Sequence, residues 1–395
     1  MMYKTIYLRR GKDESLRRFH PWVFSGAIER AGEKLEEGDI VQVLDAGGHF
    51  VALGHYQIGS IAVRVLSFEE HDIDESFWQE RLQTALDVRR SIGVAWRQDN
   101  NTYRLVHGEG DNLPGLVIDM YGGTAVMQAH SVGMHLCRMQ VAEALKAVMG
   151  ERLTAIYYKS ETTLPYKASL GQENGFIYGE SLSDVAQENG LSFHIDWLRG
   201  QKTGFFVDQR DNRSLLEHYS MGRDVLNMFC YTGGFSVYAL RGGARSVHSV
   251  DSSAKAVELV NANVELNFPG DERHKAFAED AFKYLDQMET GAYDLIILDP
   301  PAFAKHKDAL KNALRGYTKL NAKAFEKIRP GGILFTFSCS QAVNKDQFRL
   351  AVFTAAAMAR RSVRILHQLH QPADHPINIY HPEGEYLKGL VLYVE

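Results

Sequence analysis

The sequence predicts an α/β protein in which a small β-rich domain and an α+β middle domain precede a mostly parallel sheet. Three patterns support this. Residues 1–68 contain short apolar runs between turn residues, residues 69–190 mix helical and strand periods, and residues 191–395 alternate strands with helices. Such alternation is typical of a parallel sheet covered by helices on both faces. We therefore expect three domains, 1–68, 69–190 and 191–395.

The first two domains are defined by short periodic segments. In the first, strands are expected within 5–10, 39–45, 47–56 and 61–68, and "DAGGHF" (45–50) indicates a hairpin turn between alternating apolar runs. The charged stretch 69–76 then serves as a connector. In the second, apolar spacing predicts helices over 77–98 and 132–149, with strands within 103–128 and over 153–160.

The third domain shows the most regular alternation. Strands are expected at 224–229, 245–251, 275–280, 293–299 and 331–338, and helices at 234–241, 253–266, 281–288, 308–328 and 346–359. In open sheets of this kind, ligands bind beyond the carboxyl ends of the strands. Each predicted strand ends next to a residue type that can take part in ligand binding or catalysis.

Composition excludes several classes of protein. No window provides the roughly 18 consecutive apolar residues that a membrane span needs. The three cysteines, Cys137, Cys230 and Cys339, have neither metal-ligand spacing nor a disulfide pattern, so we expect a reducing, cytoplasmic location and no metal. The net charge of −5 does not itself suggest a nucleic-acid binder, although residues 1–30 carry seven basic residues against three acidic ones.

The first three strand ends of the third domain suggest an adenosine site. Gly233 and Gly234 form a turn before a helix, where the backbone can approach a ligand closely. Asp251 ends the next strand and could accept both ribose hydroxyls, and Asp280 ends the third, ahead of Phe282. The turn is not G-x-G-x-x-G, so an adenosine ligand without pyrophosphate, such as S-adenosylmethionine (SAM), fits better than NAD. The alternative is ordinary loop glycines and helix-capping acids, with Asp251 as an N-cap.

The fourth strand ends in "LDPPAF" (298–303). Two prolines cannot continue a central strand, and they hold a rigid turn whose carbonyl oxygens would suit an exocyclic amine on a base. We therefore include Pro300 and Pro301 in a base site, where Phe303 could stack on the base. Basic residues of the following stretch (304–321), among them Lys305 and Arg315, could track phosphates, or could belong to a solvated helix face.

Nine stretches give the chain a specific resemblance. They are "HPWVFSGAI" (20–28), "GEGDNLPGLVIDMYG" (108–122), "GQKTGFFVDQRDNR" (200–213), "NMFCYTGGFSVYAL" (227–240), "VDSSAKAVELVNANVELN" (250–267), "DPPAF" (299–303), "RGYTKLN" (315–321), "FTFSCS" (335–340) and "ADHPINIYHPEGEYLKGL" (373–390). On these the chain resembles the cytosine-C5 methyltransferases of large-subunit ribosomal RNA over nearly its whole length. The resemblance implies an N-terminal PUA-like RNA-binding domain, a middle domain and a C-terminal Rossmann-like class I SAM-dependent methyltransferase domain.

The resemblance also implies site residues. Asp251 matches the ribose acid, Asp280 the adenine-side acid and Asp299 the acid before the paired prolines. The first SAM-binding turn and the segment that packs over the cofactor supply further positions, and we add neighbours of the three turns. The expected cofactor residues are Lys202, Asp208, Arg210, Phe229, Tyr231, Gly233, Gly234, Phe235, Asp251, Ser252, Asp280, Asp299 and Pro300.

Cys339 is the expected nucleophile. Cytosine C5 is a poor nucleophile, and adding a thiolate to C6 would place electron density on C5, so the reaction favours a group that both adds and leaves easily. A second group near N3 must supply a proton or hydrogen bond, and Asp299 is the candidate. The alternative is an inert, buried thiol, which we expect for Cys137; for Cys230 we expect a core or cofactor-facing place. His375, Glu383, Tyr386 and Lys388 match family positions but have no role derivable from the sequence. The base that removes the C5 proton could be any of the four or none of them.

The expected function is therefore SAM-dependent methylation of a cytosine C5 in large-subunit ribosomal RNA, with a homodimer as a further expectation. One alternative keeps the fold but methylates an amine or ring nitrogen of a purine, where no thiol is needed. Another is a PUA-type RNA-binding assembly factor without catalysis. A NAD-dependent oxidoreductase would lack its glycine fingerprint.

Overall fold

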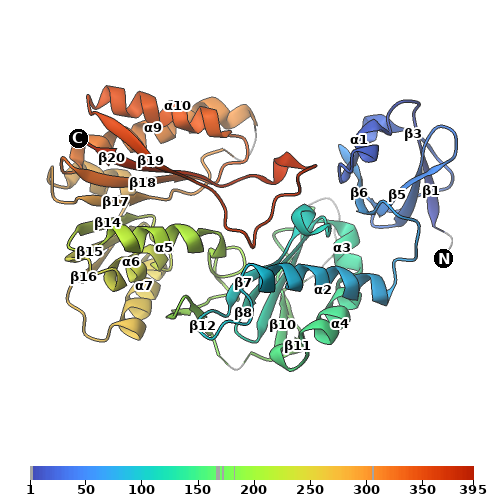
Figure 1. Ribbon diagram of the computed structural model, residues 1–395, viewed down its shortest axis with the longest axis horizontal. Coiled ribbons are helices and arrows are strands. Elements are labelled where there is room, and N and C mark those ends of the chain that lie inside the picture. The colour runs from blue at the N-terminus through green and yellow to red at the C-terminus, as the bar shows by residue number, and fades with distance from the viewer. Residues whose placement is uncertain (1–2, 166–169, 171–172, 182, 305–306) are drawn as a thin grey trace. The chain divides into compact units, whose positions relative to one another are not determined.

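The computed structural model describes residues 3–165, 170, 173–181, 183–304 and 307–395, which form two compact units (Figure 1). Unit 1 comprises Met1–Gln187, Ile195–Val207 and Ala373–Gly384, and unit 2 comprises Glu188–His194, Asp208–Pro372 and Glu385–Glu395. The α/β class is confirmed. The exact boundaries of the three expected domains stay a prediction.

Unit 1 begins with a six-stranded sheet in the order β2-β6-β5-β4-β1-β3. Its strands are β1 (Lys4–Leu8), β2 (Trp22–Phe24), β3 (Ile28–Ala31), β4 (Ile40–Leu44), β5 (Phe50–Tyr56) and β6 (Ile61–Ser67), and α1 (Glu14–Arg17) follows β1. The hairpin predicted at 45–50 is confirmed, since β4 and β5 pair antiparallel and the Asp45 carboxylate accepts the Gly47 N–H at 2.8 Å. The alternating apolar residues Ile6, Val41, Val43 and Val63 are fully buried.

The rest of unit 1 is built on a five-stranded sheet in the order β11-β10-β9-β8-β7. Its strands are β7 (Thr102–His107), β8 (Leu116–Tyr121), β9 (Thr124–Ala129), β10 (Ala155–Tyr158) and β11 (Gly175–Gly179). The helices are α2 (Glu75–Ser91), α3 (Val132–Leu136) and α4 (Arg138–Met149), and α2 packs against α4. The short strands β12 (Val185–Glu188) and β13 (Leu191–His194) form a two-stranded sheet.

Two of the expected helices differ from the observed ones. The helix expected over 77–98 ends at Ser91, because Gly93 has φ +71° and its N–H turns back to the Arg90 carbonyl. The helix expected over 132–149 is two helices, because Cys137 has φ −90° and ψ 6° and interrupts the regular bonding. Both differences come from backbone conformations that a hydrophobic period does not record.

Unit 2 holds a seven-stranded sheet in the order β16-β15-β14-β17-β18-β20-β19. Its strands are β14 (Asp224–Met228), β15 (Ser246–Asp251), β16 (His274–Ala278), β17 (Leu295–Leu298), β18 (Gly332–Ser338), β19 (Val363–Leu369) and β20 (Lys388–Val394). The first five are the expected strands and are mutually parallel, while β20 runs antiparallel between β18 and β19. Their carboxyl ends therefore lie along one edge.

In the part of unit 2 that the structure describes, six α-helices cover this sheet: α5 (Arg210–Tyr219), α6 (Gly234–Arg241), α7 (Ala254–Asn267), α8 (Ala281–Gln287), α9 (Leu310–Lys327) and α10 (Lys345–Met358). α9 packs against α8 and α10, whereas α5, α6 and α7 pack in sequence. Figure 1 shows α9 and α10 on one face of the sheet and α5, α6 and α7 on the other. The five predicted helices α6–α10 are confirmed. The apolar strand β18 is buried along its whole length, as expected for a central strand.

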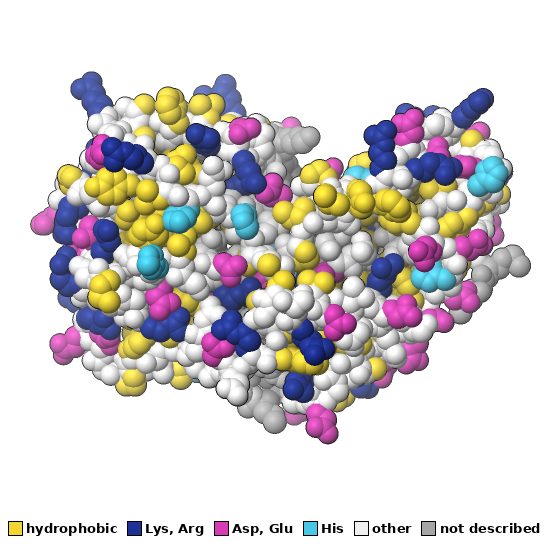
Figure 2. Space-filling model, viewed as in Figure 1, with side chains coloured by type: hydrophobic (Ala, Val, Ile, Leu, Met, Phe, Trp, Pro, Cys, Tyr) yellow, Lys and Arg dark blue, Asp and Glu magenta, His cyan; other side chains and the backbone are white. Residues whose placement is uncertain are grey.

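The surface carries both signs of charge. Figure 2 shows Lys and Arg side chains interspersed with Asp and Glu over the visible face of both units. Among the residues that the structure describes, no helix is long and apolar enough to cross a membrane.

Candidate active site

The turn after β14 has an unusual backbone. Phe229, Tyr231 and Gly233 all have positive φ, at 59°, 45° and 77°. Left-handed conformations cost a bulky residue of the order of 1–3 kcal/mol and concentrate at functional sites. At Gly233 any Cβ would lie 1.9 Å from Cγ2 of Val260, so only glycine fits. The strained turn holds backbone groups at the sheet edge where a ligand would sit.

Asp251 is tied to that turn. One carboxylate oxygen accepts the Tyr231 N–H at 3.0 Å and the other accepts the Ser253 N–H at 3.0 Å. Asp251 is not the N-cap of α7, because that position is held by Ser253, whose side chain accepts the Ala256 N–H. The carboxylate is thus held in place with lone pairs left to accept hydroxyl groups.

Asp280 has a local structural role. It is the N-cap of α8 and accepts the Lys283 N–H at 3.0 Å, and it is exposed. This is the capping alternative that the sequence left open. The adenine-side role expected for Asp280, with the partly buried Phe282 near it in sequence, stays a prediction.

Asp299 lies in a cluster of polar groups after β17. One carboxylate oxygen accepts a hydrogen bond from the Gln209 amide at 3.1 Å, and Gln209 is held in turn by the Asn212 amide at 2.7 Å. Burial and the nearby Asp208 carboxylate raise the pKa of Asp299 to about 7. A carboxyl group with this pKa is partly protonated at neutral pH and can donate a proton.

Asp208 presents an unsatisfied acceptor to this cluster. Its Oδ2 accepts the Tyr386 hydroxyl at 2.6 Å, whereas its buried Oδ1 has no hydrogen-bond donor among the described residues. A buried acceptor without a partner costs free energy unless a ligand supplies the donor. The cluster therefore suits a ligand with an N–H group, and the amino group of SAM is of that kind.

Cys339 follows β18, and Asp299 follows the adjacent parallel strand β17. Both residues therefore lie at the edge formed by the carboxyl ends of the strands. It is partly exposed, whereas Cys137 and Cys230 are buried at 7% and 6% exposure. Burial, with Asp299 and Asp208 contributing, raises the pKa of Cys339 to about 12. The resting side chain is a thiol, and its use as a nucleophile requires a group that removes the proton.

Ser340, the residue after Cys339, fixes the loop that follows β18. The Ser340 hydroxyl pairs with the Tyr317 hydroxyl at 2.9 Å and accepts the Ala304 N–H at 3.3 Å. The Ser340 carbonyl accepts the buried Lys388 ammonium at 2.7 Å. These bonds join the fourth and fifth strand ends, so the thiol is held on a supported loop.

The expected base-site residues differ in their surroundings. Pro300 is buried and Pro301 is exposed, while Phe303 packs on Tyr317 with ring centroids 4.7 Å apart. Gly316 makes room for Phe303, since a Cβ there would lie 2.9 Å from the Phe303 ring. Lys305 lies outside the described residues.

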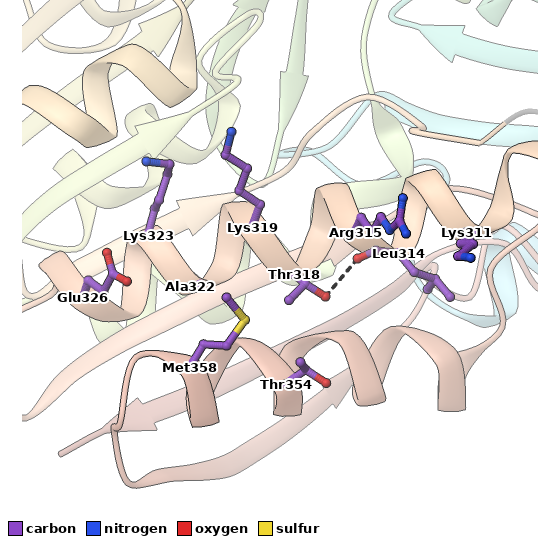
Figure 3. Close-up of a pocket in the computed structure, with 10 residues that line it drawn as sticks. All are labelled: Lys311, Leu314, Arg315, Thr318, Lys319, Ala322, Lys323, Glu326, Thr354 and Met358. Carbon is purple, nitrogen blue, oxygen red and sulfur yellow. Dashed lines mark hydrogen bonds between the residues drawn. The ribbon is translucent and has the colours of Figure 1, made fainter.

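Arg315 lies on the outer side of α9. It lines a groove of about 630 Å³ whose walls come from α9 and α10 (Figure 3). Lys311, Arg315, Lys319 and Lys323 follow one another every four residues along α9 and form what we call the basic stripe. At four residues per step the helix rises about 6 Å between neighbours.

The expected segment 202–210 is divided between the two units. Lys202 belongs to unit 1, is exposed and has φ +52°. Asp208 and Arg210 belong to unit 2, where Arg210 is 3% exposed. The role of Lys202 and Arg210 toward the cofactor stays a prediction, as do the roles of Phe235, which is buried in the first turn of α6, and the exposed Ser252.

Sequence reasoning gave no role to three residues of this site. Gln209 bonds Asp299, Tyr386 bonds Asp208, and Lys388 bonds the carbonyl of Ser340. The family-like C-terminal stretch contained Tyr386 and Lys388, but only the antiparallel pairing of β20 with β18 brings Lys388 opposite Ser338. The other two residues named there, His375 and Glu383, lie in unit 1.

The chain matches two family models and is similar over nearly its whole length to known proteins. Residues 163–387 match the family model of S-adenosylmethionine-dependent methyltransferases, and residues 6–68 match that of a PUA-like domain. The "Ribosomal RNA large subunit methyltransferase I" proteins of Aeromonas hydrophila and Tolumonas auensis are 42% and 41% identical to the chain, each covering 99% of both sequences.

Solved structures share the fold. A SAM-dependent methyltransferase from Streptococcus mutans superposes with a TM-score of 0.84 at 22% identity, over 99% of this chain and 100% of that one. A methyltransferase crystallised with S-adenosylhomocysteine gives the same TM-score at 23% identity and covers 100% of both chains.

Proposed function

The chain belongs to the ribosomal RNA large subunit methyltransferase I family of SAM-dependent methyltransferases, and we propose that it methylates C5 of a cytosine in large-subunit ribosomal RNA. The observation that carries the proposal is that Asp299 and Cys339 directly follow the adjacent parallel strands β17 and β18. The thiol is partly exposed and the carboxyl group has a raised pKa, which are the properties that a nucleophile and a proton donor need there.

The cofactor would be held by the first three strand ends. We propose that the strained turn 229–234 approaches its adenosyl part and that Asp251 accepts the ribose hydroxyls. The free Oδ1 of Asp208 would accept the amino group. When bound, SAM supplies an electrophilic methyl group on a positively charged sulfur.

The chain's own residues would carry the remaining steps. The Cys339 thiolate adds to C6 of the cytosine while Asp299 delivers a proton or hydrogen bond at N3, and the electron density that reaches C5 attacks the methyl group. A base then removes the C5 proton, the C5–C6 double bond re-forms, and the carbon–sulfur bond breaks to return the thiolate. Asp299 recovers its proton when N3 loses it.

RNA would be held in part by the basic stripe. Figure 3 shows Lys311, Arg315, Lys319 and Lys323 along α9, with Thr354 and Met358 on α10 across the groove. A row of cations at regular spacing suits a sugar–phosphate strand and reads no sequence. On a chain of net charge −5 such a local row would supply the attraction that the whole molecule lacks.

The test is replacement of Cys339 by Ala, with methyl transfer measured from labelled SAM to ribosomal RNA. We expect transfer to fall to background while SAM binding by calorimetry is retained, because the thiol does not hold the cofactor. Nucleoside mass spectrometry of wild-type product should show 5-methylcytidine. Undiminished transfer by Cys339→Ala, or methylated purines as the product, would contradict the proposal.

Two further properties of the protein, its location and its oligomeric state, are proposed. Action on ribosomal RNA would place the protein in the cytoplasm. A homodimer is also proposed from the family resemblance, and sedimentation equilibrium would test it: a molecular mass near 44.5 kDa at micromolar concentration would contradict it.

A further inference from the structure

Lys388 is a buried cation beside the proposed nucleophile. It begins β20, lies directly opposite Ser338 in the pairing with β18, and is 4% exposed. Its ammonium donates to the Ser340 carbonyl at 2.7 Å, which fixes the side chain next to the Cys339 loop. Lysine is almost never buried to this degree without a partner charge, because its hydration is lost.

The charges around Lys388 and Cys339 act on each other. Burial lowers the pKa of Lys388 to about 8, while the Cys339 thiolate and the Glu385 carboxylate favour the ammonium and Lys345 disfavours it. The Lys388 ammonium in turn favours the thiolate, which burial and the carboxylates Asp299 and Asp208 oppose. Lys388 is thus a group that can be neutral near pH 8 and that gains a counter-ion when the thiol ionises.

We propose that Lys388 acts as the base that takes the proton of Cys339. The resulting ammonium then holds the thiolate as an ion pair. The S–H bond breaks, the proton bonds to the lone pair of the neutral amine, and the products are a thiolate and an ammonium. When the thiolate leaves C6 at the end of the cycle, the proton can return to sulfur. The step needs no outside reagent, and it rests on the proposed role of Cys339.

The Ser340 carbonyl explains why a lysine suits this place. It accepts one N–H of the ammonium and so orients the remaining donors without adding a negative charge that would compete with the thiolate. A guanidinium would keep the positive charge but could not accept a proton at any pH that the protein tolerates. Lysine combines both properties.

The experiment measures thiol reactivity in the full-length protein. Alkylation of Cys339 by iodoacetamide is followed by mass spectrometry between pH 6 and 10 in wild type and in Lys388→Gln, Lys388→Met and Lys388→Arg. We expect Lys388→Gln, whose amide can still reach the Ser340 carbonyl, to slow alkylation at pH 8 at least tenfold and to move the profile to higher pH. Lys388→Met should do the same, and Lys388→Arg should keep the alkylation rate while methyl transfer falls at least tenfold.

Lys275→Met is the matched control. Lys275 is an exposed lysine on β16 that is not among the charges acting on Lys388 or Cys339, so its loss should leave the alkylation profile unchanged. A wild-type profile in both Lys388→Gln and Lys388→Met would overturn the inference, and so would a profile in Lys388→Arg as slow as in Lys388→Gln. Those results leave the nucleophile untouched, because failure of the proposed function is reported separately by methyl transfer in Cys339→Ala.

Discussion

At the scale of single residues, burial favours the neutral forms of the two reacting groups of the proposed centre. The pKa of Asp299 is raised to about 7 and that of Cys339 to about 12, and burial is the first cause of both shifts. Neutral groups can lie close together at a buried, low-dielectric site without repulsion. A proton donor at N3 and a thiol that ionises only beside a cation follow from the same burial.

Replacing Asp299 by Asn should stabilise the protein at high pH. The pKa of the carboxyl group rises from 3.8 unfolded to about 7 folded, so ionisation disfavours the native state. Wild type should therefore lose stability as the pH rises from about 4 to 7, and Asp299→Asn should not. At pH 8 we expect the variant to be more stable by roughly 1–3 kcal/mol, and at pH 4 the difference should vanish. Urea unfolding at several pH values measures it.

The exposed carboxylate Glu326 on α9 provides the control for this experiment. Glu326→Gln should show no difference from wild type that grows with pH. An Asp299→Asn variant that is less stable than wild type at pH 8 would mean that the carboxylate is ionised and favourably paired in the folded protein. The same variant should be poor in methyl transfer, since an amide cannot deliver a proton.

At the scale of elements, the turn between β14 and α6 gives a prediction that separates strain from steric conflict. Gly233 has φ +77° and no room for a Cβ beside Val260, whereas Gly222 has φ +68° and no atom within 4 Å of a Cβ. Gly222→Ala should cost about 1 kcal/mol from backbone strain alone. Gly233→Ala should cost at least about 3 kcal/mol and weaken SAM binding, because α7 must move. Denaturant unfolding and calorimetry measure both; equal costs for the two variants would refute the steric argument.

The basic stripe on α9 makes a prediction about salt dependence. Lys311 and Arg315 are exposed, and Lys323 already contacts Asp286, so the first two are the freer cations. Replacing both with Ala should weaken RNA binding uniformly across sequences and lower the slope of log affinity against log salt by about 1.4 for a single strand. Lys275→Ala on the sheet-edge strand β16 removes an exposed charge elsewhere and should leave the slope unchanged. Filter binding at several salt concentrations measures this slope. An unaltered slope in the double variant would rule out the basic stripe as an RNA-binding surface.

The sequence predicts an element when its local pattern of apolar residues is sufficient to identify it. It does not predict which distant strand an element pairs with. The five parallel strands of unit 2 and its helices α6–α10 are evident from apolar runs and helical periods, whereas α5 was not predicted. The candidate residues at the strand ends were predicted together with those strands. Strand β20 was not predicted, because its apolar run gives no indication of its partner or direction. Lys388 and Tyr386 therefore had no derivable role, and Gln209 had no signal beyond its place in a family-like segment.

At the scale of the whole molecule, each compact unit is assembled from three separate stretches of chain. The segments Ile195–Val207 and Ala373–Gly384 join unit 1, although their sequence neighbours belong to unit 2. Domain boundaries predicted from composition divide the chain into consecutive segments. They therefore cannot show that a later segment returns to an earlier unit. Thr203 gives one physical reason for the first return, since its hydroxyl donates to the buried Asp119 carboxylate at 2.6 Å.

Asp374 gives a physical reason why the segment Ala373–Gly384 joins unit 1. Its carbonyl accepts a hydrogen bond from the fully buried Arg89 at 2.7 Å, and its carboxylate accepts the Arg104 N–H at 3.0 Å, so a C-terminal residue completes the unit 1 core. Asp374→Ala leaves the Arg104 N–H without this acceptor and should destabilise unit 1 by about 2–4 kcal/mol. The matched variant Asp346→Ala removes an exposed carboxylate on α10 and should cost less than about 1 kcal/mol.

Calorimetric unfolding with and without SAM tests whether the two units respond separately. SAM at 100 times its dissociation constant stabilises the state that binds it by about 2.7 kcal/mol. If unit 2 alone holds the cofactor, SAM should raise the transition of unit 2 equally in wild type and in Asp374→Ala, while the transition of unit 1 stays lowered in the variant. A single transition that SAM restores to the wild-type temperature would mean that the units unfold together, and a SAM affinity lowered by Asp374→Ala would mean that the segment Ala373–Gly384 contributes to the cofactor site.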